Sequence, residues 1–203
     1  SMSLNQGGGF VKSDPTLDAP DLQIYFSPLS YSTAPYGRRP LMMPDPYPAV
    51  RLGFSLCKPT SEGSISIQSV DSSVPPKFFG NYLSTRYDQK TMISGMKLMR
   101  KLTKTEALRE IILSEKIPGN AVKSDEDLLD FARANAETVF HQCGTCRMGN
   151  NPSNSVVDEK LKVRGVSGLR VADASIFPTI PSGNINAPSI MVGEKAAEMI
   201  LGG

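Results

Sequence analysis

Histidine is almost missing from this chain of 203 residues, in which His141 is the single example. Imidazole is the one side chain whose unperturbed pKa lies near neutrality, so it is the natural proton acceptor at physiological pH. Any acid–base chemistry that needs such a group here must therefore use His141.

Cysteine is also scarce, with three residues in the chain. So small and odd a number excludes a disulfide scaffold and favours a reducing compartment, so we expect a cytoplasmic location. Cys143 and Cys146 have the C-x-x-C spacing of thiol redox motifs, in which a helix N-terminus lowers the pKa of the first thiol. Because Gly144, Gly149 and Pro152 disfavour a helix there, a thiol redox site is the weaker alternative.

Neither an excess of one charge nor a long apolar run is present. The chain has 22 basic and 20 acidic residues, for a net charge of +2, and its basic residues are scattered. We therefore expect no nucleic-acid partner, which would require a basic patch. No apolar run approaches the roughly 18 residues of a membrane span, so we expect no transmembrane segment.

A glycine-rich phosphate turn is missing as well. The pattern Gly-x-Gly-x-x-Gly, placed between a strand and a helix, holds dinucleotide phosphates on backbone N–H groups. The run Gly7-Gly8-Gly9 is not followed by apolar residues at helical spacing. We interpret this run as flexible backbone or the entrance of a strand. Ser1 to Leu4 are interpreted as an expression scar and left out of the fold prediction.

Strand periodicity dominates the first third of the chain. Apolar residues alternate with other residues over 22–26 and again over 50–57, which predicts two half-buried strands. A turn-rich stretch leads from the second run to a further alternation at 65–67, so we predict an antiparallel hairpin between these two. The segment 32–48 is rich in proline and aromatic residues and predicts an irregular loop.

Helical spacing follows in three places. The first two helices are predicted by stripes of apolar side chains, the second behind the capping pair Thr103 and Glu106. Ser124 and Asp127 predict a capping box at the start of the third helix. The inward-facing residues are Met92, Met96 and Met99, then Leu108, Ile111 and Ile112, then Leu128, Phe131, Ala132 and Ala136.

The last third carries three motifs rich in polar residues and glycine. They are HQCGTCRMG at 141–149, RVADAS at 170–175 and PSGNINAP at 181–188. Apolar residues around the second motif predict a buried strand over Leu169 to Asp173. Apolar spacing from Pro188 onward predicts a closing helix, since proline suits a first helical turn.

These motifs, in this order, resemble the carboxy-terminal part of the glucose-methanol-choline (GMC) family of flavin oxidoreductases, especially its choline and alcohol dehydrogenase branch. The resemblance extends back through 81–84, 20–23 and 8–13, so it covers nearly the whole chain. Members of the family begin with the glycine-rich turn that is missing here. The resemblance therefore implies a carboxy-terminal fragment, and a missing N-terminal portion that would bind most of the FAD.

The resemblance implies an α+β fold in two parts. Residues 1–140 would form the substrate-binding domain, an antiparallel sheet backed by helices, with the loop 32–48 as either a substrate lid or an ordered surface loop. Residues 141–203 would supply the active-site loop and a C-terminal strand and helix that complete the FAD domain. Without its parallel neighbours, the strand 169–173 would leave an exposed edge, which favours association or partial disorder there. Three tyrosines, Tyr31, Tyr36 and Tyr47, lie in or beside the loop.

Alcohol oxidation requires removal of the hydroxyl proton and transfer of a hydride to an acceptor that no amino-acid side chain provides. The resemblance assigns FAD as that acceptor, an alcohol as the substrate and His141 as the proton acceptor. It assigns Asn184 to holding the substrate oxygen, since a carboxamide donates and accepts hydrogen bonds without titrating. The alternatives are an ordinary loop histidine and a turn asparagine after Gly183.

The resemblance also places four residues near the cofactor. Asp173 and Ala174 match a strand end whose backbone approaches the flavin, and Asn186 and Ala187 lie at the helix entry. A helix N-terminus carries partial positive charge, so these backbone donors would stabilise the anionic reduced flavin. No metal site is predicted.

Two further functions remain open, together with two departures from the family pattern. A lyase on the same fold would cleave cyanohydrins with the histidine as acid and base. A non-catalytic sheet module would bind partners through its exposed edge. Glu62 stands where the family commonly has arginine, and Gln142 stands where proline is frequent. Neither departure touches the proposed base. The exchange of arginine for Glu62 puts the local hairpin or domain contacts in doubt.

Overall fold

The computed structural model describes residues 5–31 and 43–202. Unit 1 comprises Ser1–Leu56 and Lys90–Asn135, and unit 2 comprises Cys57–Gln89 and Ala136–Gly203. The predicted boundary between residues 140 and 141 concerns the domains of a longer enzyme and stays a prediction. Most of the predicted loop 32–48, with Tyr36, lies outside the described residues. Within these ranges, no helix has both the length and the apolar character needed to cross a lipid bilayer.

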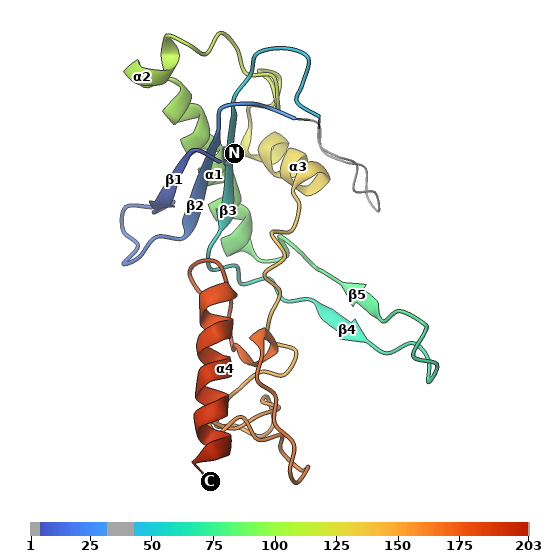
Figure 1. Ribbon diagram of the computed structural model, residues 1–203. Coiled ribbons are helices and arrows are strands. Elements are labelled where there is room, and N and C mark those ends of the chain that lie inside the picture. The colour runs from blue at the N-terminus through green and yellow to red at the C-terminus, as the bar shows by residue number, and fades with distance from the viewer. Residues whose placement is uncertain (1–4, 32–42, 203) are drawn as a thin grey trace. The chain divides into compact units, whose positions relative to one another are not determined.

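Unit 1 is built on an antiparallel sheet with the order β1-β2-β3 (Figure 1). Its strands are β1 (Gly7–Val11), β2 (Leu22–Ser27) and β3 (Arg51–Leu56), so both strands predicted from alternation are confirmed. The glycine run is the entrance of β1 rather than a phosphate turn. A Cβ on Gly8 would lie 2.3 Å from the carbonyl oxygen of Ile24, so glycine permits the close pairing of β1 with β2.

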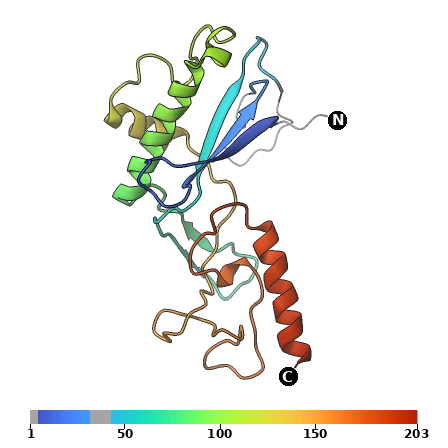
Figure 2. The ribbon, with the colours of Figure 1, turned by 90° about the vertical axis from the view of Figure 1, so that its left-hand side faces the viewer.

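Helices cover one face of this sheet (Figure 2). They are α1 (Arg86–Thr103), which enters unit 1 at Lys90, and α3 (Asp125–Asn135); the short α2 (Glu106–Arg109) follows α1 and buries no residue. Met96 and Met99 are buried, as the methionine stripe predicts. Gly95 lets α1 approach β3, because a Cβ there would lie 2.3 Å from the ring of Phe54. The α+β architecture of an antiparallel sheet backed by helices is confirmed.

The capping predictions differ in outcome between two helices. At α3, the Asp127 N–H donates to Ser124 Oγ and the Ser124 N–H donates to the Asp127 carboxylate, both at 3.0 Å, so the capping box is confirmed. At α2 the predicted pair is wrong, because Thr103 ends α1 and its hydroxyl donates to the Arg100 carbonyl. The helix has 4 residues and leaves Ile111 exposed, since a stripe of three apolar residues does not fix helix length.

A second, two-stranded sheet lies in unit 2. It pairs β4 (Ser64–Ser66) with β5 (Lys77–Phe79) in antiparallel register (Figure 1). The predicted hairpin between 50–57 and 65–67 is therefore wrong, because β3 pairs with β2 instead. Period-two alternation shows which residues share a face of a strand, but it carries no information on the neighbouring strand.

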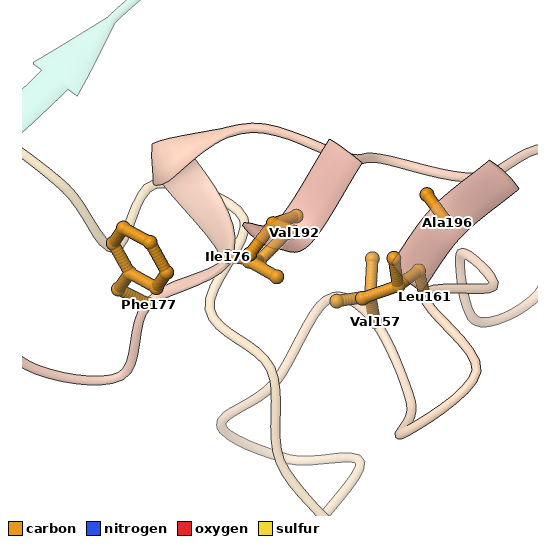
Figure 3. Close-up of a cluster of buried hydrophobic side chains, with 6 residues drawn as sticks. All are labelled: Val157, Leu161, Ile176, Phe177, Val192 and Ala196. Carbon is orange, nitrogen blue, oxygen red and sulfur yellow. The ribbon is translucent and has the colours of Figure 1, made fainter. Parts of the chain in front are cut away.

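The core of unit 2 is assembled largely from loops. It lies between the 3-10 turn η1 (Ala174–Ile176) and α4 (Asn186–Leu201), and α4 confirms the predicted closing helix (Figure 3). The predicted strand 169–173 is wrong, since the segment makes only an isolated bridge from Arg170 to Lys162. Within the described ranges no strand lies beside it to form a ladder, so the predicted exposed sheet edge does not form. The buried residues are Val157, Leu161, Ile176, Phe177, Val192 and Ala196.

Candidate active site

The structure brings together the two residues that the motifs single out, both in unit 2. Asn184 Nδ2 lies 2.8 Å from His141 Nε2, although the two residues are 43 positions apart in the chain. A carboxamide nitrogen can only donate, so Nε2 of the imidazole accepts this hydrogen bond. The neutral ring then carries its proton on Nδ1, and its basic lone pair points at Asn184.

The other ring nitrogen of His141 is buried and has no hydrogen-bond partner among the described residues. Catalytic histidines commonly have this second nitrogen fixed by a carboxylate or a backbone carbonyl, which sets both tautomer and ring orientation. Here the orientation of the imidazole depends on Asn184 and on the backbone that carries His141.

That backbone is held by contacts on both sides of the histidine. After it, the Cys146 N–H donates to the Ser175 carbonyl at 3.0 Å and the Met148 N–H donates to the Ile176 carbonyl at 2.8 Å. These bonds attach the 141–149 loop to η1. Gly144 begins the turn that leads to these bonds: its carbonyl accepts from the Arg147 N–H at 3.3 Å, and its φ of +91° lies in the region that side-chain-bearing residues avoid.

Directly around His141, the Thr138 hydroxyl and the Gln142 carboxamide form hydrogen bonds within the segment 138–142. The Phe140 N–H donates to Thr138 Oγ1 at 3.0 Å, and Gln142 Nε2 donates to the same oxygen at 2.8 Å. Gln142 Nε2 also donates to the Tyr82 hydroxyl at 3.2 Å. The segment directly around the histidine is therefore tied both to itself and to residue 82.

A further link to the loop comes from Glu62. The Arg147 guanidinium lies 2.7 Å from the Glu62 carboxylate. The backbone next to Glu62 is anchored in turn by Asp88, whose buried carboxylate accepts hydrogen bonds from the N–H groups of Thr60 and Ser61 at 2.8 Å each. Burial raises the pKa of the Asp88 carboxyl, but hydrogen bonds from Ser61 and Thr60 outweigh it and leave the pKa below its ordinary value.

The four residues predicted to lie near a cofactor occupy two helix starts. Asp173 caps η1, because its carboxylate accepts the Ser175 N–H at 2.7 Å, and Ala174 is the first residue of that turn. Asn186 and Ala187 are the first two residues of α4, which has no side-chain cap. Their N–H groups meet no acceptor in the part of the chain that the structure describes. Close to Asp173, Ser175 Oγ is buried and meets no hydrogen-bond partner in the described part of the chain.

The cysteine pair lacks the features of a thiol redox site. Cys143 and Cys146 are free, and no helix begins at Cys143 in the described chain. Burial raises the pKa of the Cys143 thiol, and the nearby Arg147 guanidinium lowers it less. A nucleophilic thiolate needs the opposite environment, so the structure disfavours the redox alternative.

Three residues around His141 are not identified by the sequence interpretation: Tyr82, Thr138 and Phe140. Threonine two residues before a turn residue is a known side-chain turn pattern, so the Thr138 to Phe140 bond could have been predicted from spacing. The left-handed backbone of Phe140 and the 60-residue reach from Gln142 to Tyr82 have no local signal in the sequence.

Comparisons with known proteins identify the family of the chain. Residues 59–193 match the carboxy-terminal GMC oxidoreductase family. The chain is 42% identical over 203 residues to an alcohol dehydrogenase [acceptor] of Pseudomonas putida, covering 98% of this chain and 35% of that protein. It is 37% identical over 196 residues to a mitochondrial choline dehydrogenase of Mus musculus, covering 96% of this chain and 32% of that protein.

Solved structures extend the similarity to the fold. The structure of pyridoxine 4-oxidase from Mesorbium loti matches with a TM-score of 0.85 at 25% identity, over 98% of this chain and 38% of that one. A fungal aryl-alcohol oxidase matches with a TM-score of 0.73 at 29% identity, over 90% of this chain and 28% of that one. The chain thus spans about a third of the length of the curated relatives it matches. On this evidence the chain belongs to the GMC oxidoreductase family.

Proposed function

We propose that this chain is the carboxy-terminal portion of an FAD-dependent oxidoreductase that acts on the CH–OH group of an alcohol. The observation that carries the proposal is the 2.8 Å contact between His141 Nε2 and Asn184 Nδ2. The names of the relatives, an alcohol dehydrogenase and a choline dehydrogenase, support the substrate class. The chain by itself is expected to be inactive, because it spans about a third of their length.

The two side chains offer a hydroxyl group one acceptor and one donor once they move apart from their direct contact. A hydroxyl oxygen has one proton to donate and two lone pairs that accept. An alcohol placed between the residues therefore donates to His141 Nε2 and accepts from Asn184 Nδ2, and it replaces their direct hydrogen bond. Since asparagine does not titrate, His141 takes the proton when the carbonyl forms.

FAD, when bound, supplies the acceptor for the hydride that leaves the alcohol carbon. The residues of this chain fit such a group. The N–H groups of Asn186 and Ala187 have no acceptor among the described residues and lie at the positive end of a 16-residue helix, which suits an anionic edge. The Asp173 carboxylate already caps η1, and the family resemblance assigns the contact with the cofactor to the backbone of Asp173 and Ala174.

The proposal is tested in the full-length enzyme by anaerobic mixing with a series of alcohols, choline included, while the flavin absorbance is followed. We expect the flavin to be reduced, and His141→Ala to slow the reduction per bound flavin by about 10² to 10⁴. Thr105→Val is the control, because the Thr105 hydroxyl bonds only the Leu102 carbonyl in unit 1.

Two outcomes would contradict the proposal. An Ala variant at His141 that reduces flavin as fast as the parent would remove the assigned base. A parent enzyme that stays oxidised with every alcohol but cleaves a cyanohydrin would instead be a lyase of the same family.

A further inference from the structure

The orientation of His141 poses a problem that the two proposed catalytic residues do not solve. Its Nδ1 is buried and has no partner among the described residues, so the ring is not fixed from behind. Asn184 contacts Nε2, but in the proposed reaction the substrate hydroxyl replaces this contact. Among the described residues, the backbone at residues 140–142 then remains to direct the imidazole during the reaction. The inference below rests on the proposed function of His141.

The backbone immediately before His141 is strained. Phe140 has a φ of +59°, in the left-handed region that a bulky side chain rarely occupies. The residue is 72% exposed, so burial of its side chain does not compensate for this conformation. Such a residue keeps a positive φ only where surrounding contacts impose it.

Thr138 and Gln142 provide contacts of this kind. The Thr138 hydroxyl oxygen accepts from the Phe140 N–H at 3.0 Å and from Gln142 Nε2 at 2.8 Å, which uses both of its lone pairs. The second N–H of the same Gln142 nitrogen donates to the Tyr82 hydroxyl at 3.2 Å. One hydroxyl thus holds the residue before His141 and the residue after it, and Tyr82 anchors the pair from a distant part of the chain.

We propose that Thr138 is a positioning residue for His141: its hydroxyl, shared between Phe140 and Gln142, holds the strained turn that aims the imidazole at the substrate oxygen. Gln142 completes the arrangement through Tyr82. Neither Thr138 nor Gln142 contacts the reacting atoms, and both act through the direction of the base. The glutamine at position 142 makes this arrangement possible, because a proline there would have no carboxamide to share.

The experiment compares two variants of Thr138 in the full-length enzyme loaded with flavin. Thr138→Val keeps the branched shape but removes the hydroxyl, whereas Thr138→Ser keeps the hydroxyl. We expect Val to lower the rate of flavin reduction by about tenfold to hundredfold, as expected for a misdirected catalytic group, with little change in the alcohol concentration for half-maximal rate. Ser restores most of the rate. Gln142→Ala and Tyr82→Phe lower the rate in the same direction, the latter least.

Rates are measured per bound flavin, so that loss of folded protein does not imitate loss of positioning. Equal loss in Val and Ser would overturn the proposal, as would a Val variant with the parent's rate or one that changes only the half-saturating concentration. If His141→Ala is slow but Thr138→Val is fast, the proposed function stands and this inference fails. If His141→Ala is itself fast, the proposed function fails.

Discussion

The His141 imidazole accepts a hydrogen bond from the Asn184 carboxamide, and this contact joins two motifs that lie 43 residues apart. The motif of His141 packs against the core of unit 2 through Cys143 and Met148, and the motif of Asn184 leads directly into α4. The same packing that builds the core therefore brings a base and a neutral donor together. The identity of each group determines what the pair can do, which leads to the first prediction.

Replacement of Asn184 by Asp should shift the pH dependence of alcohol oxidation. A carboxylate beside Nε2 favours the protonated imidazole more than a neutral carboxamide does, so the rise of kcat/KM moves to higher pH than in the parent. Asn184→Ala, which adds no charge, should lower kcat/KM by about ten- to hundredfold without moving the profile. A pH series of flavin reduction checks both variants, and an unshifted profile for the Asp variant contradicts the assignment.

Asp88 should stabilise the protein in a pH-dependent way. Its pKa lies below the ordinary value of 3.8, since hydrogen bonds from Ser61 and Thr60 outweigh the effect of burial. The charged form therefore adds stability above that value, and the added stability is lost as the pH falls below it. Asp88→Asn should reduce the free energy of unfolding by about 1–3 kcal/mol at pH 7. Urea unfolding at pH 7 and near pH 3 checks this, because the difference between parent and variant should shrink at the lower pH.

The ion pair between Glu62 and Arg147 should contribute little, and the contribution should depend on salt. The Glu62 side chain is 71% exposed and that of Arg147 is 36% exposed, so solvent screens their attraction. We expect Glu62→Arg to lower the free energy of unfolding by at most about 1 kcal/mol, and the loss to diminish in 1 M salt. The exchange Glu62→Arg with Arg147→Glu should recover part of it. A double variant no better than the sum of the single ones would show that the pair is not formed.

Cys143 should be chemically quiet. Burial raises the pKa of its thiol more than Arg147 lowers it, so little thiolate is present at neutral pH. Alkylation of the native enzyme by iodoacetamide, followed by mass spectrometry, should modify Cys143 much more slowly than in urea. Cys143→Ala should keep flavin reduction within about twofold of the parent. Rapid alkylation with loss of activity would revive the thiol alternative.

The sequence is a good guide where the determinant of structure is local. Alternation identifies β2 and β3, and the pair Ser124 and Asp127 marks the start of α3, because strand faces and helix caps depend on residues a few positions apart. It fails where the determinant is a partner. β4 pairs with β5 rather than β3, and the segment 169–173 forms no strand without neighbours.

The residues of the candidate site also differ in whether local sequence identifies them. The motifs identify His141 and Asn184, and the structure shows that they meet. The positive φ of Phe140 cannot be predicted from the residue type, which disfavours it, so the contribution of Thr138 becomes visible only in three dimensions. Tyr82 is missed for a related reason, since its contact with Gln142 spans 60 residues.

The last helix of the chain stabilises the part of unit 2 that carries Asn184, although its final turns hold no site residue. Val192 and Ala196 of α4 close this core over Ile176, a residue of the turn that Asp173 caps. A protease cut before Val192 would uncover that turn and release the strand-free segment on which Asn184 is carried. The last turns of α4 contain no residue of the proposed site, yet the contact between His141 and Asn184 depends on their packing.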